Sequence, residues 1–148
     1  MKNLLLLFLF ISNLSVGQNY FQQEVNYTIQ VSLDDKNLIL HAYEEFEYVN
    51  NSPDELSFIY IHLWPNAYAD NKSAMAKQHY RDGNKIMEDL PEIDKGFIDS
   101  LDFKVNGNKV EFLYNLSHKD IGKLMLKSPL KPGEKITVST PFRVKIPS

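Results

Sequence analysis

The chain has 148 residues, no cysteine and a formal net charge of −3, with 43% hydrophobic and 24% charged residues. This composition excludes a disulfide scaffold and cysteine-ligated metal sites, and the negative net charge argues against a general nucleic-acid binder. The charge is uneven, because residues 18–102 hold 6 basic and 16 acidic groups whereas residues 103–148 hold 9 basic and 3 acidic groups. We therefore expect acidic and basic strands to meet within one domain, or one edge to face a partner.

Residues 1–17 have the pattern of a signal peptide. Lys2 precedes an unbroken apolar run over residues 4–11, and small polar residues lead to a cleavage site after Gly17. The run is too short to cross ~30 Å of hydrocarbon, which takes roughly 20 apolar residues. We expect an exported protein at the periplasm, the cell surface or outside the cell, with a mature domain over 18–148 and no membrane span after signal removal.

Three strands are expected in the first half of the mature chain. Residues 24–33 alternate apolar and polar side chains, which predicts a strand with one face in water, and Asp34 begins a turn. Residues 38–50 predict a second strand, whose apolar face Glu44 interrupts, so we expect Glu44 near a strand end, a bulge or solvent. Residues 56–64 are apolar on both faces, which predicts a central or covered strand. Together the three segments predict an antiparallel meander.

The second half predicts an insertion followed by more strands. Residues 65–95 break the alternation and include a short helix from Ser73 to Arg81. Further strands are expected at 98–105, 109–116, 124–127 and 135–146. Pro141 predicts that the last strand lies at an edge or contains a bulge. The predicted fold class is all-β, a mostly antiparallel saddle- or sandwich-like sheet domain with one short helical insertion at about 65–95.

No catalytic, cofactor-binding or metal-binding residue is predicted. The four histidines are widely separated, and none begins an H-E-x-x-H pair. His41 and His62 fall in expected strands, where they would permit a two-histidine site if the strands were neighbours, but hydrogen-bonded sheet histidines are the preferred interpretation. No G-x-S-x-G elbow occurs. The acidic run at Glu44, Glu45 and Glu47 is interpreted as a solvated strand end, because it lacks the glycine and spacing of a calcium loop.

The aromatic residues have two interpretations, a carbohydrate-binding face or the core. The two interpretations concern nine of those between the mature start and the beginning of the insertion: Tyr20, Phe21, Tyr43, Phe46, Tyr48, Phe58, Tyr60, Trp64 and Tyr68. Most alternate in step with the other apolar residues, which favours core packing. We expect Trp64, Pro65 and Tyr68 to face a partner surface.

Several phrases of the sequence resemble one known family. They are Tyr20-Phe21-Gln22-Gln23, the stretch from Tyr48 to Asp54 (YVNNSPD), residues 56–68 (LSFIYIHLWPNAY) and the corner at residues 129–134 (PLKPGE). In this order the chain resembles the N-terminal domain of M1-family (gluzincin) zinc aminopeptidases, in the secreted Bacteroidetes-type form. The stretch from NNSPD to HLWPNAY is fairly specific, whereas the PLKPGE corner alone would be weak.

The resemblance implies a saddle-shaped β-domain that packs on a thermolysin-like catalytic domain of the same polypeptide. That domain would hold the zinc, the general-base glutamate and the grip on the peptide substrate's amino end, and its motifs are absent here. The implied function is therefore a non-catalytic domain, present here as a fragment, that braces the catalytic domain and walls its cleft. The alternative is a free-standing exported β-sandwich that binds a glycan or a protein.

Overall fold

The chain folds into two antiparallel sheets in a computed structural model that describes residues 20–85, 87–88 and 90–147, so the expected signal peptide lies outside the described part. The large sheet has the order β1-β2-β9-β5-β6, with β4 also pairing with β9, and the small sheet has the order β3-β8-β7. The large sheet comprises β1 (Glu24–Asp34), β2 (Ile39–Val49), β4 (Phe97–Asp99), β5 (Lys104–Val105), β6 (Asn108–Lys109) and β9 (Lys135–Lys145). The small sheet comprises β3 (Leu56–His62), β7 (Phe112–Tyr114) and β8 (Ile121–Leu130). The predicted all-β class with a helical insertion is confirmed.

The first hairpin forms where its alternation predicts. β1 and β2 pair along their whole length without a shift in register, from Glu24 opposite Val49 to Asp34 opposite Ile39. The Asp34 carboxylate closes the turn, since its Oδ1 accepts hydrogen bonds from the backbone N–H groups of Lys36 and Asn37. The continuous register keeps every second side chain of β1 on the same face of the large sheet.

The core lies between the two sheets. Its buried members are Phe46, Ile59, Phe103, Leu124 and Val138. Phe46 and Val138 come from neighbouring strands of the large sheet, and Ile59 and Leu124 from neighbouring strands of the small one. Each such side chain stabilises the fold by about 1.5–3 kcal/mol through burial, so this cluster holds the sheets face to face.

The predicted meander is wrong at its third strand. β3 leaves the large sheet and becomes an edge strand of the small one, and the second neighbour of β2 is β9. β3 is apolar on both faces although only one is covered: Ile59 is buried in the core, while Tyr60 on the outer face is 61% exposed. The central strand of the small sheet is β8, which is far longer than the predicted strand at 124–127.

The middle of the chain also differs from the prediction, because it changes sheets. The expected strand over 98–105 is split into β4 and β5, and the expected strand over 109–116 is split into β6 and β7. The predicted turn at Asn106 and Gly107 does form, with positive φ at both residues. Val110 and Glu111 then carry the chain from the large sheet to the small one.

Pro141 lies neither at a sheet edge nor at a bulge. β9 pairs with β2 along its whole length, and on its other side with β4 from Phe97 to Asp99 and with β5 at Lys104 and Val105. Pro141 stands in the gap between these two short partners. In that gap the backbone N–H of Asp102 donates to the Thr140 hydroxyl at 2.9 Å, so a side chain replaces a backbone ladder bond.

Asn50 joins two of the places where the chain passes between the sheets, and we call its hydrogen bonds there the clasp. It begins the connection from β2 to β3, and its backbone exchanges hydrogen bonds with the turn from β8 to β9: its N–H donates to the Glu134 carbonyl at 2.9 Å, and Gly133 N–H donates to its carbonyl at 2.7 Å. Its side-chain amide donates to the carbonyls of Asp54 and Leu130, both at 2.9 Å. Because Asn50 is fully buried, these bonds have no water to replace them.

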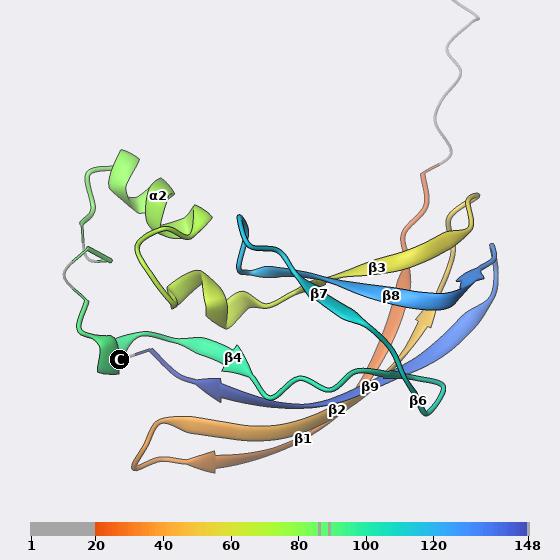
Figure 1. Ribbon diagram of the computed structural model, residues 1–148, viewed down its shortest axis with the longest axis horizontal. Helices are drawn as coiled ribbons and strands as arrows, with labels where there is room; N and C mark the ends of the chain where they lie inside the picture. The colour runs from red at the N-terminus through yellow and green to blue at the C-terminus, as the bar shows by residue number, and fades with distance from the viewer. Residues whose placement is uncertain (1–19, 86, 89, 148) are drawn as a thin grey trace, which may run out of the picture.

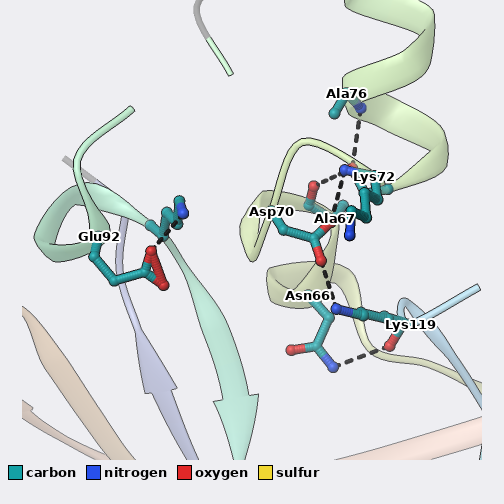
Figure 2. Close-up of polar contacts among 9 residues, drawn as sticks. Asn66, Ala67, Asp70, Lys72, Ala76, Glu92 and Lys119 are labelled. Carbon is teal, nitrogen blue, oxygen red and sulfur yellow. Dashed lines mark hydrogen bonds and ion pairs between the residues drawn. The ribbon is translucent and has the colours of Figure 1, made fainter. Parts of the chain in front are cut away.

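The insertion is tied to both sheets by polar contacts, and Figure 2 shows those to Lys119 beside the small sheet. It contains η1 (Trp64–Tyr68), α2 (Ala74–Arg81) and η2 (Glu92–Asp94), and none of these helices has the length or apolar character of a membrane span. The Asn66 amide donates to the Lys119 carbonyl beside the small sheet, and its oxygen accepts from the Ile98 N–H of β4 in the large sheet, both at 3.0 Å. Asp70 pairs with the Lys119 ammonium, and Ser73 caps α2 as predicted.

Replacing Asn50 with alanine should destabilise the domain strongly. The change leaves the Leu130 and Asp54 carbonyls without their amide donor in the interior, and we expect a loss of about 2–4 kcal/mol in the free energy of unfolding. Urea denaturation of the purified chain measures it. Asn51→Ala is the matched control, because the exposed Asn51 side chain donates only to Gln22 O, and it should cost less than about 1 kcal/mol. Equal, small losses of unfolding free energy in both variants would contradict the stabilising role of the Asn50 amide.

Gly122 on β8 should not tolerate a side chain. A Cβ atom there would lie 1.9 Å from Cζ of the Phe112 ring, which itself packs against Phe103. Gly122→Ala should therefore lower the free energy of unfolding by about 1–3 kcal/mol, because the added methyl group overpacks the site. In a Phe112→Leu background the same glycine substitution should cost less, because the obstructing ring is gone. An unchanged cost in that background would show that Phe112 is not the cause.

Candidate functional site

Apart from Glu44, the inner face of β1 and β2 in the large sheet is apolar, and the described residues cover it at one end alone. β1 contributes Val25, Tyr27, Ile29, Val31 and Leu33 to this face, and the residues opposite them on β2 are Tyr48, Phe46, Glu44, Ala42 and Leu40. The small sheet covers the end at Phe46, while the β1–β2 turn extends beyond it (Figure 1). Ile29, Val31 and Leu33 are consequently 50%, 55% and 58% exposed. We call the part of this face formed by Ile29, Val31, Leu33, Leu40, Ala42 and Glu44 the open face.

Glu44 lies in the middle of β2, so of its predicted places, a strand end, a bulge or solvent, the first two are wrong, while its side chain stays partly open to solvent. It is in register with Ile29 on one side and with the buried Thr140 on the other. It has no hydrogen bond or ion pair to any residue that the structure describes. Burial raises the pKa of the Glu44 carboxyl above its ordinary value. Glu44 is thus a half-buried acid within an apolar surface.

The other two acids of the run point away from the open face. Glu45 and Glu47 fall on the opposite side of β2 by strand alternation, and the Glu47 carboxylate pairs with the Lys135 ammonium at 2.8 Å. The interpretation as a strand end is therefore wrong, although Glu45 is exposed to solvent as expected. The three carboxylates occupy the middle of the most extensively paired hairpin, on two different faces.

Among the described residues, four of the five ion pairs join a base from residues 103–148 to an acid from residues 18–102, which confirms that the uneven charge brings acidic and basic segments together. The strongest by geometry joins Arg143 to both carboxylate oxygens of Asp99. This pair lowers the pKa of the Asp99 carboxyl through its hydrogen bonds. Glu44 receives no such base.

The two strand histidines lie apart. His41 is on β2 of the large sheet, and His62 is on β3 of the small sheet, where its ring stacks on Trp64 with centroids 5.1 Å apart. The two-histidine arrangement therefore does not form. Among residues 20–85, 87–88 and 90–147, no three His, Asp or Glu side chains gather in a group that would hold a metal ion.

Most of the nine aromatic residues are at the surface, so the preference for core packing is wrong for them. Only Phe46 is buried, whereas the exposed members are Tyr20, Phe21, Tyr43, Tyr60, Trp64 and Tyr68. Trp64 and Tyr68 are exposed as expected for a partner surface, at 68% and 40%. Tyr60, His62 and Trp64 form a strip on the outer side of the small sheet, and the ammonium of Lys123 lies 3.7 Å from the Phe58 ring beside it.

A cavity of about 420 Å3 lies beside the insertion helix. Lys77, Tyr80 and Arg81 of α2 and the buried Met87 are among the residues that line it. The Lys85 ammonium lies 5.6 Å from the Tyr80 ring centroid, so part of this basic lining is already engaged within the chain. Among the described lining residues no nucleophile stands with a base and no two carboxylates come together, so the open face is the better candidate.

Comparison with models of known protein families and with curated proteins finds no match for this chain.

Replacing Glu44 with glutamine should stabilise the chain at neutral pH. Because the folded-state pKa of Glu44 is raised, ionisation costs stability as the pH rises through that value, and the cost is absent below the unfolded-state pKa of about 4.3. In thermal melts, the midpoint temperature of Glu44→Gln should be above that of the wild type at pH 7 and equal to it near pH 4. The control Glu45→Gln, on the opposite face, should show no such pH-dependent gain. A destabilised Glu44→Gln at pH 7 would mean that the carboxylate is satisfied in the fold.

Proposed function

We propose that this chain is a non-catalytic β-domain of a larger exported metallopeptidase similar to the M1 zinc aminopeptidases, in which it braces the catalytic domain. The observation that carries the proposal is the open face, where half of a large apolar sheet surface lacks a cover. A contiguous exposed apolar surface of this kind is typical of an interaction site. In the proposed enzyme the catalytic domain covers it.

The clasp at Asn50 supports this function by making the two sheets a rigid support. The phrases that carry the family resemblance, YVNNSPD and PLKPGE, meet at this residue: Asn50 bonds to Ser52 in the first and to Leu130, Gly133 and Glu134 in the second. Two sheets fixed at their crossing points would hold the open face at a constant angle to a docked domain.

The described residues do not fit a zinc ion. Catalytic zinc needs three protein ligands from His, Asp or Glu, and no such group occurs in the described ranges. In the proposal the metal, the base and the grip on the peptide's amino end therefore belong to the catalytic domain, and this chain contributes support and a wall of the cleft.

The alternative function is recognition of a glycan or a protein by a free-standing β-sandwich. The observation that favours it is the aromatic strip of Tyr60, His62 and Trp64, whose Tyr60 and Trp64 rings are more than half exposed. Aromatic rings with polar edges suit such surfaces because they combine apolar area with hydrogen-bonding groups. This strip lies on the small sheet and not on the open face.

The DNA downstream of the Ser148 codon tests the proposal. We expect an open frame encoding H-E-x-x-H, the zinc-binding pair of this peptidase class. A stop codon with no such gene nearby would contradict the proposal and favour the binding module.

The isolated chain should neither bind zinc tightly nor act as a peptidase. Metal analysis of the purified 148-residue chain should find zinc far below one equivalent, and aminoacyl substrates should not be cleaved, because the described residues gather no metal ligands. Tight stoichiometric zinc, or peptidase activity that a chelator removes, would contradict this expectation. A cytosolic aminopeptidase of known activity assayed in parallel is the control.

A further inference from the structure

The free edge of β1 has few of the devices that usually protect an exposed strand. Among the described residues β1 pairs with β2 alone, so its other edge has no strand partner from this part of the chain for its backbone N–H and C=O groups along 11 residues. Natural edge strands are shielded by lysine, proline, bulges or short length. The sequence EVNYTIQVSLD has no lysine and no proline, and its register with β2 is continuous. This edge is therefore ready to accept another strand.

The open face beside this edge has an unbalanced negative charge. The inner-face residues of β1, β2 and β9 include no lysine or arginine, and Glu44 is their one charged side chain. The ends of β1 add Glu24 and Asp34, so the edge carries only acids. A docked partner would remove the remaining water from Glu44, and such a buried carboxylate is costly unless the partner supplies a positive group.

We propose that the edge of β1 and the open face together bind an extended polypeptide segment that has apolar side chains at alternate positions and one lysine or arginine directed to Glu44. Backbone bonds to β1 would provide the pairing, and alternate side chains of the added strand would continue the apolar surface of Ile29, Val31 and Leu33. The identification of this segment with part of the catalytic domain rests on the proposed function.

A second copy of the chain fits this site poorly. Antiparallel pairing of two β1 strands about Ile29 would place Glu24 opposite Asp34 at both ends, and directly opposed like charges destabilise a strand pair. It would also bring two Glu44 carboxylates to one apolar face without a base. An anionic lipid surface meets the same repulsion. A basic, extended polypeptide is the partner that this charge pattern favours.

Two short peptides test the proposal on the 148-residue chain. Both have valine at alternate positions and threonine between them; one has arginine at the central valine position, and the other has glutamine there. We expect the arginine peptide to bind about tenfold more tightly, a difference of about 1.4 kcal/mol. NMR shifts of the labelled chain should change along β1 and around Glu44. In Glu44→Gln the two peptides should bind alike, whereas Glu45→Gln, altered on the opposite face, should keep the preference.

Equal affinities for the two peptides, shifts elsewhere, no binding, or dimerisation through β1 would each overturn the proposal. These outcomes are separate from those of the proposed function. A downstream frame without H-E-x-x-H would remove the catalytic domain as the partner, and the arginine preference at Glu44 would still stand or fall by the peptide measurements.

Discussion

The fold depends above all on the hydrogen bonds of one buried side chain, Asn50. Two of the connections between the large and the small sheet, from β2 to β3 and from β8 to β9, pass this residue, and its amide and backbone join the end of β8, the turn before β9 and the loop before β3. The apolar core alone does not fix the angle between two sheets, because the hydrophobic effect is not directional. The hydrogen bonds of the buried Asn50 amide are directional, so they can fix this angle. It determines which end of the large sheet is covered, and so where the open face begins.

The sequence pattern predicts the local elements correctly but does not predict how the strands pair within the two sheets. The alternation in β1 and the capping serine at residue 73 depend on near neighbours, and both form as predicted. The meander failed at β3 because period-2 alternation cannot say which strand is the neighbour, and an edge strand with an exposed aromatic face has the composition of a central one. The prediction for Pro141 is wrong for a related reason. Proline has no backbone N–H to donate, and β4 and β5 leave a gap beside it, in which the Thr140 hydroxyl accepts a hydrogen bond from Asp102.

The sequence gives only an indirect sign of the candidate site. Glu44 breaks an apolar pattern, which predicts a place near a strand end, a bulge or solvent. The structure instead keeps it in the middle of β2, with a raised pKa and no base from the described residues. The basic residues of the later chain are used elsewhere, since Lys135 pairs with Glu47 and Arg143 with Asp99. Such an assignment of partners depends on tertiary register, which a single sequence does not give.

Together these features fit the proposed scaffold, in which the small sheet covers one half of the large sheet and a polypeptide partner would cover the other half. Hydroxyl-radical footprinting tests this most directly, with Ile29, Val31 and Leu33 compared between the 148-residue chain and the longer polypeptide that the proposed function expects. The account predicts rapid oxidation of these three residues in the chain, while buried Leu124 is protected, and protection of all four in the longer polypeptide. Protection of Ile29, Val31 and Leu33 in the monomeric chain, or their continued oxidation in the longer polypeptide, would contradict it.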